Sequence, residues 1–202
     1  MPEEPDHTPL AEDRAAGETA LLVIDMLSGW DFDGAAALLA QAVPIAPRIA
    51  ALKARCRAAR VPVVYANDNH GRWRSDFREV VAAALQGDSD GARIARQLAP
   101  DEHDYFVLKP KHSGFHATPL DLLLRHLGVR TLIATGVSSD QCVLYTAADA
   151  RMHDYRVIVP RDCVATQSPR RNELALRHFD DVMGLETPPS ERLAVPPSPA
   201  VP

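Results

Sequence analysis

Three residues from distant parts of the chain, Asp25, Lys109 and Cys142, combine a carboxylate, an ammonium and a thiol. Each lies at the end of a short apolar run or soon after one. A thiol attacks a carbonyl carbon as its thiolate, so it needs a proton acceptor and gains from a nearby cation. The set therefore predicts nucleophilic catalysis by Cys142, with Asp25 as the acceptor and Lys109 as the cation.

Cys142 lies at a predicted junction between a strand and a helix. The preceding segment, 136–141, has the pattern of a strand end, a turn and a helix start. Ser138, Ser139 and Asp140 are candidate caps for that helix. A cysteine in the first helical turn meets the positive end of the helix dipole, which predicts a lowered pKa and a thiolate. The alternative is that Cys142 is a small buried hydrophobic residue.

The other residues of these types have simpler interpretations. Cys56 falls on an apolar helical stripe and Cys163 follows a predicted strand, so we expect both to pack in the core. Asp25 also fits a strand-terminal residue that caps a turn. Lys109 lies closer to its strand end than Lys111 does, which makes it the better candidate to point inward, although most lysines lie on solvated faces.

The elements that position these residues alternate between two apolar periods. Short continuous apolar runs, typical of strands covered on both faces, occupy residues 20–25, 61–67, 105–109, 131–137 and 156–160. Segments with helical periodicity separate them. This order predicts one α/β domain with a mostly parallel, doubly wound sheet of five to six strands and helices on both faces. Ligands bind at the carboxyl ends of the strands in such sheets, where Asp25, Lys109 and Cys142 all fall.

The helical stripes predict which side chains face the sheet. Three stripes are Ile45, Ile49, Leu52 and Cys56; Phe77, Val80, Val81, Ala84 and Leu85; and Leu120, Leu123, Leu124 and Leu127. A helix that starts near Cys142 is expected to bury Leu144, Ala148 and Met152, and a last helix, near 170–182, to pack through Leu174 and Phe179.

The composition indicates an ordinary globular protein and excludes several functions. The 202 residues suit one domain, and a net charge of −5 disfavours a sequence-independent grip on nucleic acid. No signal peptide pattern or membrane-spanning run of about 20 apolar residues is visible. Three widely spaced cysteines form no disulfide framework, which favours the cytoplasm.

Two tails are expected to flank the domain. Residues 1–18 are polar and lack an apolar period, and residues 187–202 contain six of the 17 prolines. Both segments are predicted to be flexible, which leaves residues 19–186 as the folded domain.

Three segments of the chain resemble the isochorismatase-like cysteine hydrolase family. They are residues 21–26, residues 109–115 and residues 136–143. The third is similar to the family signature Gly-Val-(Ala/Ser)-(Thr/Ser)-Asp-x-Cys-Val, and the resemblance runs from about Thr19 to Met183.

The resemblance implies a function and a set of site residues. It assigns Asp25, Lys109 and Cys142 as the catalytic set, and implies a cis peptide bond between Val137 and Ser138. The Ser138 and Cys142 N–H groups would then form an oxyanion hole. The implied activity is hydrolysis of a small amide or imide C–N bond through a thioester, without a cofactor, in an enzyme that commonly forms dimers or tetramers.

One segment of the sequence partly matches a metal site. Asp68-Asn69-His70 resembles the Asp-x-His pair that begins the metal site of nicotinamidases, but the next histidine is His103. Two ligands do not make a firm site, so we predict no metal and expect Asp68 and Asn69 to shape a turn. The alternatives are a metal-assisted nicotinamidase or pyrazinamidase, and a non-catalytic small-molecule-binding protein on the same scaffold.

Aromatic residues near the predicted site are candidates for its walls. Trp30, Phe32, Trp73 and Phe115 are assigned to substrate binding, although Trp73 also fits a solvated loop anchored by one aromatic ring. His112 and His116 have no partner in this scheme, and we expect them to be surface or supporting groups.

Overall fold

The computed structural model of the chain describes residues 18–69, 71 and 76–195. Its strands are β1 (Thr19–Ile24), β2 (Val63–Asp68), β3 (Tyr105–Lys109), β4 (Thr131–Val137), β5 (Arg156–Ile158) and β6 (Val164–Ala165). Its helices are α1 (Ala35–Ala58), α2 (Phe77–Ala84), α3 (Asp90–Gln97), α4 (Leu120–His126), α5 (Cys142–Met152) and α6 (Pro169–Arg177). A π-helical turn, η3 (His178–Val182), continues α6, and a 3-10 turn, η4 (Ser190–Arg192), lies near the end of the described chain.

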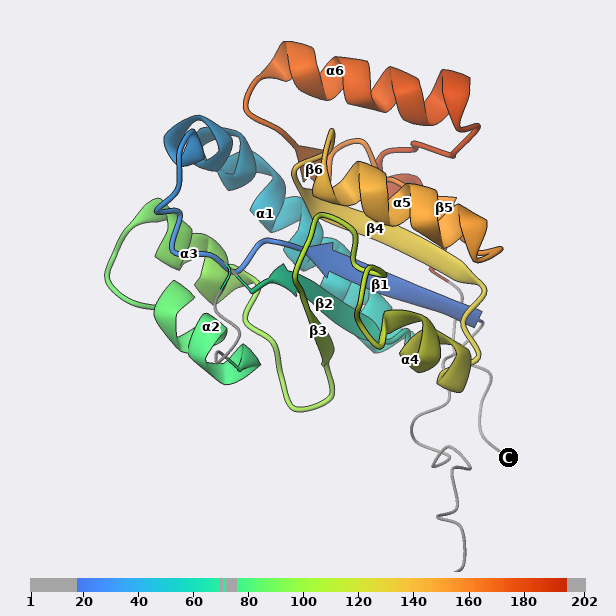
Figure 1. The fold of residues 1–202 in the computed structure, drawn as a ribbon, viewed down its shortest axis with the longest axis horizontal. Helices are drawn as coiled ribbons and strands as arrows, with labels where there is room; N and C mark the ends of the chain where they lie inside the picture. Colours follow the sequence, from blue (N-terminus) through green and yellow to red (C-terminus); the bar gives the residue numbers. More distant parts are fainter. Residues whose placement is uncertain (1–17, 70, 72–75, 196–202) are drawn as a thin grey trace, which may run out of the picture.

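All strand pairs in the sheet are parallel, and the order is β3-β2-β1-β4-β5, with β6 paired to the end of β4. β1 and β4 lie side by side in the middle (Figure 1). The chain builds outward from β1 through β2 to β3, then returns to the other side of β1 as β4. This topology confirms the predicted α/β fold, and it puts the reversal of strand order between β1 and β4, where such sheets bind ligands.

The element boundaries agree closely with the sequence prediction for the long elements and fail for two short ones. β3 and β4 have the predicted bounds. β6, which is two residues long, was not predicted from the sequence. Nor was α3, an eight-residue helix with a glycine in its first turn, which is a poor helix former.

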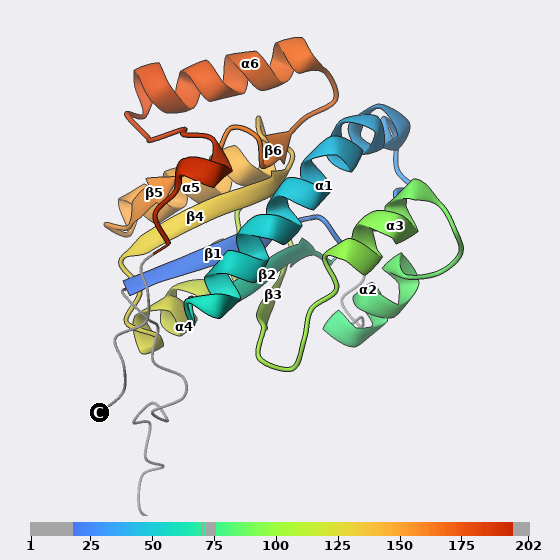
Figure 2. The ribbon, with the colours of Figure 1, turned by 180° about the vertical axis from the view of Figure 1, so that it is seen from behind.

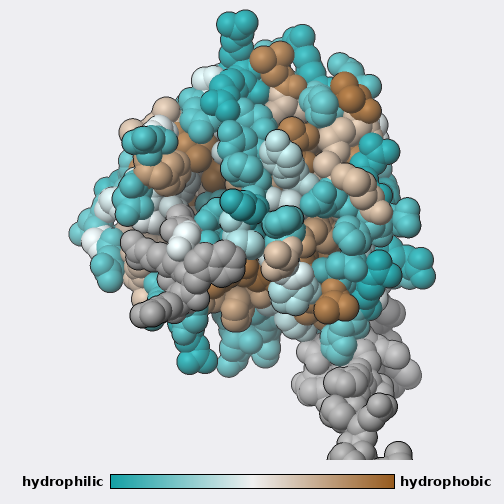
Figure 3. Space-filling view, viewed as in Figure 1, coloured by the Kyte–Doolittle hydropathy of each residue, from teal (hydrophilic) through white to brown (hydrophobic). Residues whose placement is uncertain are grey.

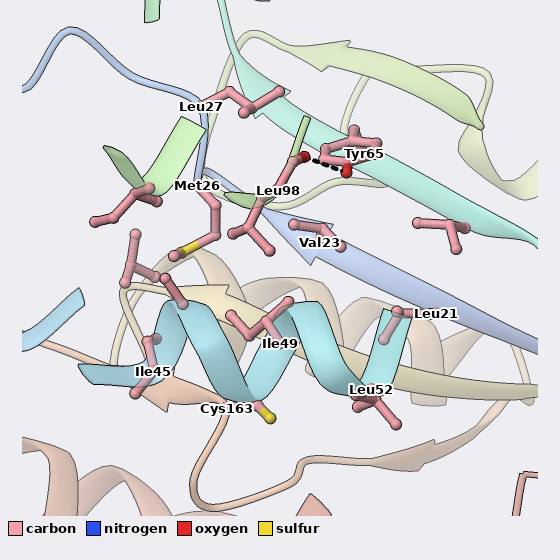
Figure 4. Close-up of a cluster of buried hydrophobic side chains, with 14 of the residues drawn as sticks. Leu21, Val23, Met26, Leu27, Ile45, Ile49, Leu52, Tyr65, Leu98 and Cys163 are labelled. Carbon is pink, nitrogen blue, oxygen red and sulfur yellow. Dashed lines mark hydrogen bonds between the residues drawn. The ribbon is translucent and has the colours of Figure 1, made fainter. Parts of the chain in front are cut away.

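One face of the sheet is covered by α1, with α3 packed beside it (Figure 2). The α1 side chains Ile45, Ile49 and Leu52 face Leu21 and Val23 of β1 in a closed apolar cluster, as the helical stripe predicted (Figure 4). α1 is long and apolar enough to cross a membrane by length and composition alone. One stripe of α1 is buried against the sheet, so its apolar composition is that of a core helix.

The opposite face is covered by α4, α5 and the end of α6, and here two predicted packing faces are wrong. α5 buries Val143, Thr146, Ala147 and Ala150; of the predicted residues, Leu144 is partly buried against this core, whereas Met152 is 75% exposed. α5 carries apolar residues on all sides, so the period alone did not select the face, and the small alanines allow close approach to the sheet. Leu174 of α6 is exposed in the same way, whereas Phe179 is buried as expected.

The exposed apolar residues do not gather into one patch on the face drawn in Figure 3, where brown side chains are interspersed among hydrophilic ones. Scattered exposed hydrophobic residues are normal on a protein surface.

The segment after α6 packs against the domain as far as residue 195, which corrects the predicted flexible tail from residue 187. Leu193 is buried in the α1 cluster, and the Arg55 guanidinium donates hydrogen bonds to the carbonyl oxygens of Ser190 and Leu193. Ser190 in turn donates from its N–H and its hydroxyl to the Asp162 carboxylate, each at 2.7 Å. The prolines suggested a flexible tail, but the carbonyl oxygens that bind Arg55 and the buried Leu193 side chain hold this segment against the domain. Residues 1–17 and 196–202 lie outside the described residues.

A buried polar network connects α1 to the start of β3. The Lys53 ammonium lies 3.0 Å from the Asp104 carboxylate, and both side chains are at most 4% exposed. Lys53 also donates to the Tyr65 hydroxyl and the Ala99 carbonyl, and Tyr65 donates to the Leu98 carbonyl. Burial lowers the pKa of Lys53, and the Asp104 charge opposes that effect. The network fixes where β3 begins, and therefore where Lys109 at its other end is placed.

We expect Asp104→Ala to lower the free energy of unfolding by about 3–5 kcal/mol, because it leaves the Lys53 charge buried without its partner. Asp101→Ala is the matched control: its carboxylate pairs with Arg57 at 2.7 Å but is 41% exposed, so it should cost less than about 1 kcal/mol. Urea unfolding of both variants measures the difference. Equal losses in the two variants would show that the buried Lys53–Asp104 pair stabilises the protein no more than the exposed Arg57–Asp101 pair does.

Candidate active site

The ends of four neighbouring strands bring the chemically active residues together. Asp25 follows β1, Asp68 ends β2, Lys109 ends β3, and Cys142 opens α5 after β4. The register pairs Asp68 directly with Lys109 across β2 and β3. Parallel strands end at one edge of a sheet, so residues separated by more than a hundred positions meet there.

The Lys109 ammonium is the centre of the cluster. Its side chain is fully buried, and Nζ lies 2.8 Å from Asp25 Oδ2 and 3.6 Å from Asp68 Oδ2. Nζ also lies 3.5 Å from Cys142 Sγ and 3.3 Å from the Lys111 carbonyl oxygen. Burial by itself lowers the pKa of Lys109, but the negative charges of Asp25 and Asp68, with Cys142, outweigh it and raise the pKa above its ordinary value. Lys109 is therefore a fixed positive charge beside the sulfur.

Asp25 is held from two sides. Its Oδ2 binds Lys109, and its Oδ1 accepts a hydrogen bond of 2.7 Å from the Asp68 N–H. Its backbone has a φ of 53°, in the left-handed region that aspartate tolerates better than most residues. This conformation turns the chain sharply at the end of β1.

The backbone before Cys142 depends on one glycine. Gly136 has a φ of 110°, and a Cβ there would lie 2.0 Å from the carbonyl oxygen of Ile24 on β1, so no other residue fits. The Val137–Ser138 peptide bond is cis, as the resemblance implied. The Ser138 carbonyl accepts from the N–H groups of Gln141 and Val143.

None of the three predicted caps binds the start of α5 through its side chain. The N-cap residue is Gln141, and it makes no side-chain cap hydrogen bond. Asp140 instead accepts hydrogen bonds of 2.6 Å from the Thr166 hydroxyl and 2.7 Å from Arg171 Nε. The carboxylate therefore joins the start of α5 to the loop after β6 and to α6.

The predicted thiolate at Cys142 is corrected by its surroundings. Burial and the charge of Asp25 raise its pKa to about 12, and the opposing effect of Lys109 is smaller. The group is therefore a neutral thiol near pH 7 in the free protein. The helix dipole favours a thiolate, but the Asp25 carboxylate beside the sulfur comes from a distant part of the chain and opposes it.

The candidate wall residues divide into two groups. The Trp30 ring covers Gly91 at the start of α3, where a Cβ would meet Trp30 Cδ1 at 2.3 Å, and Phe32 lies 6.4 Å from Trp30 and is 43% exposed. Both follow β1 at the active edge, which keeps them as candidates. Trp73 lies outside the described residues.

Phe115 does not line the site near Cys142. Its ring packs against His153 at 5.1 Å and Tyr155 at 5.9 Å, in the core beneath α4 and α5. Cys142 opens α5 and His153 follows its last residue, so the length of the helix, ~16 Å, separates them. The prediction that Phe115 contacts substrate is therefore replaced by a core packing role.

Sequence reasoning missed two neighbours of the cluster. Asp68 appeared as a turn residue or metal ligand, not as the second carboxylate on Lys109; the strand order that pairs them is not visible in the sequence. His112 had no predicted partner, yet its Nδ1 lies 3.6 Å from Cys142 Sγ. Its closeness in sequence to Lys109 was the available signal. Asn69 does shape a turn, because its side chain accepts from the Gly71 N–H at 2.9 Å.

The metal question concerns Asp68 and His70. Within residues 18–69, 71 and 76–195, no three His, Cys, Asp or Glu side chains group as metal ligands. His70 itself lies outside these residues, so the absence of a metal stays a prediction.

Comparison with known proteins assigns the family. A family model described as the isochorismatase domain matches residues 19–187. The chain belongs to the isochorismatase family. It is 37% identical over 176 residues to an uncharacterized isochorismatase family protein, YaaI, of Bacillus subtilis, which covers 87% of this chain and 96% of the relative.

Two further relatives of the isochorismatase family carry named activities. The ureidoacrylate amidohydrolase RutB of Methylorubrum extorquens is 30% identical over 213 residues, covering 91% of this chain and 83% of the relative. The solved structure of N-carbamoylsarcosine amidase from Thermoplasma acidophilum matches with a TM-score of 0.66 at 28% identity, covering 87% of this chain and 98% of that one. These findings confirm the predicted family, the fold class and the amidohydrolase type of enzyme.

The charges around Cys142 predict opposite effects of two substitutions on its alkylation. Asp25→Asn removes a negative charge that raises the Cys142 pKa, so iodoacetamide should react faster at any pH below about 12. Lys109→Met removes the opposing positive charge and should slow the reaction. A pKa change of one unit changes the thiolate fraction about tenfold. The alkylation rate changes by less, because a thiolate of lower pKa is a weaker nucleophile.

Peptide mass spectrometry over a pH series measures these rates, and Cys142→Ser reports the background from the other two cysteines. Cys142 should label before Cys56 and Cys163, which are 0% exposed. Slower labelling of Asp25→Asn than of the parent would contradict the electrostatic account.

Proposed function

We propose that this protein hydrolyses a small amide or imide C–N bond through a thioester on Cys142. The observation that carries the proposal is the arrangement around Lys109, whose Nζ lies 2.8 Å from Asp25 Oδ2 and 3.5 Å from Cys142 Sγ. A base, a cation and a nucleophile within one contact shell are the parts that covalent catalysis needs.

Acylation uses Asp25 twice. Asp25 takes the thiol proton as the Cys142 sulfur attacks the carbonyl carbon, while Lys109 stabilises the negative charge on the sulfur. The tetrahedral intermediate then breaks its C–N bond, and Asp25 gives the proton to the leaving nitrogen. Because the pKa of the free thiol is about 12, attack near neutral pH depends on this base.

The N–H groups of Ser138 and Cys142 are proposed to bind the oxyanion. Within the described chain, the backbone hydrogen bonds at this turn use the N–H groups of Ser139, Gln141 and Val143, and none uses those of Ser138 or Cys142. Cys142 is the first residue of α5, so the helix itself offers its N–H no acceptor. Two free N–H groups beside the nucleophile suit a developing oxyanion.

Water then hydrolyses the thioester, which releases the acid and restores the Cys142 thiol. Trp30 and Phe32, at the end of β1, are proposed to contact the substrate. Ammonia release from a panel of small primary amides and substrate loss by chromatography for a panel of imides, measured with the parent protein and Cys142→Ala side by side, test the class and search for the substrate.

The alternative of a metal-assisted nicotinamidase rests on Asp68 and His70. The Asp68 carboxylate lies 3.6 Å from the Lys109 ammonium, and that fixed positive charge disfavours a divalent cation on the same oxygen. Asp68 is better explained as a partner of Lys109 and, through its N–H, of Asp25. We therefore favour the metal-free reaction.

The second alternative is a protein that binds a small molecule without catalysis. Such a protein would have no use for a buried ion pair beside a cysteine. Burying the Lys109 ammonium destabilises the folded state unless it is paired. Here it contacts both Asp25, the proposed base, and the Cys142 sulfur. That arrangement supports catalysis over binding alone.

We expect Cys142→Ala to lose about 10³- to 10⁶-fold in turnover, because the reaction has no other nucleophile. Asp25→Asn should lose a comparable amount, because it removes the base even though it favours the thiolate. Circular dichroism confirms that each variant is folded. Turnover of Cys142→Ala within tenfold of the parent would refute the nucleophile.

Activity should survive exhaustive chelation, because a thiolate and two N–H groups can complete the reaction without a Lewis acid. The measurement is turnover before and after chelator treatment, with metal content from elemental analysis. His70→Ala should change turnover little. Stoichiometric metal, with activity lost on chelation and restored on adding the metal back, would establish the nicotinamidase alternative.

A further inference from the structure

The Cys142 sulfur has a second ionisable neighbour. Lys109 Nζ lies 3.5 Å from Sγ and Asp25 lies behind it, whereas His112 Nδ1 lies 3.6 Å from Sγ. Lys109 is fully buried, but His112 is exposed to solvent. The buried acid-base pair and the exposed imidazole thus reach the same atom from different environments.

The His112 ring is held in place by Tyr145, which lies three residues after Cys142 on α5. The two rings stack with centroids 5.5 Å apart and an interplanar angle of 19°. The stack is built on the helix that carries the nucleophile, so it keeps Nδ1 toward the sulfur.

The proposed mechanism leaves one proton transfer unassigned, the activation of water that cleaves the thioester. Asp25 is a carboxylate again once its proton has gone to the leaving nitrogen, but its two oxygens are already bound by Lys109 and by the Asp68 N–H. The exposed His112 imidazole is in contact with solvent water, whereas the Lys109 side chain is fully buried. Histidine is the side chain that most often acts as a general base, directly or through one water.

We propose that His112 is the catalytic base for deacylation. This inference rests on the proposed function of Cys142. Neutral His112 accepts a proton at Nδ1 from a water molecule as the water oxygen bonds to the thioester carbon. The tetrahedral intermediate breaks its C–S bond, the acid leaves, and the sulfur takes the proton back from Nδ1. Tyr145 is a positioning residue for the imidazole.

The test uses p-nitrophenyl acetate, an activated ester that acylates a thiol without a specific amide pocket. Release of p-nitrophenolate in the first turnover reports acylation of Cys142, and the steady state reports deacylation. Intact-protein mass spectrometry detects the acetyl group on the enzyme. Cys142→Ala gives the background for both signals.

His112→Gln removes the base, and His112→Phe removes it while keeping a ring against Tyr145. In both variants the first turnover should stay within about threefold of the parent. The steady-state rate should fall about 10²- to 10⁴-fold, the usual contribution of a general base, and acetyl-Cys142 should accumulate. His116→Gln, an exposed histidine of the same loop, is the matched control and should behave like the parent.

Free imidazole supplies the readout that a merely structural role would not move. Added to His112→Ala, it should raise the steady-state rate and clear the acetyl group by more than the same imidazole does with Cys142→Ala and with His112→Phe, whose ring fills the position. Steady-state rates near the parent in all three His112 variants would overturn the proposal. Loss of the first turnover together with the steady state, or recovery of deacylation in His112→Phe, would overturn it as well.

The experiment separates this inference from the function beneath it. If the parent protein is never acylated on Cys142, both the nucleophile and its base are wrong. If Cys142 is acylated but the His112 variants deacylate normally, only the role of His112 is wrong.

Discussion

The buried ammonium of Lys109 is the charge around which the site is organised. A cation removed from water is costly unless carboxylates neutralise it, and Asp25 at 2.8 Å and Asp68 at 3.6 Å do so from the ends of two other strands. The ion pairs therefore require that β1, β2 and β3 end at the same level. The register that aligns Asp68 with Lys109, and the network that fixes the start of β3, serve that requirement.

The same carboxylate that stabilises Lys109 controls the nucleophile. Burial, with the added charge of Asp25, raises the pKa of the Cys142 thiol to about 12, which favours the thiol over the thiolate that reacts with electrophiles and oxidants. In the proposed mechanism, the thiol loses its proton to Asp25 only as the sulfur attacks a carbonyl carbon. The resting protein therefore has a thiol with a proposed base beside it, and not a reactive thiolate.

The scaffold separates this chemistry from substrate choice. The strand ends that carry Asp25, Lys109 and Cys142 are buried and tightly paired, whereas Trp30, Phe32 and His112 lie on the loops that follow the strands. Loops at the carboxyl edge can vary without disturbing the ion pairs. This division is consistent with a family whose relatives are named for different substrates, ureidoacrylate and N-carbamoylsarcosine.

The sequence by itself determined the fold class, the long strands and the three residues at the strand ends, because apolar period and residue type are local properties. Only the tertiary structure decided what surrounds them. The strand order joined Asp68 to Lys109, and a loop brought His112 to the sulfur. The face buried by α5, the core position of Phe115 and the packing of Leu193 likewise depended on partners distant in the chain. The Cys142 pKa shows the reason most clearly: the helix start is local and suggested a thiolate, but burial and the Asp25 charge are tertiary and made it a thiol.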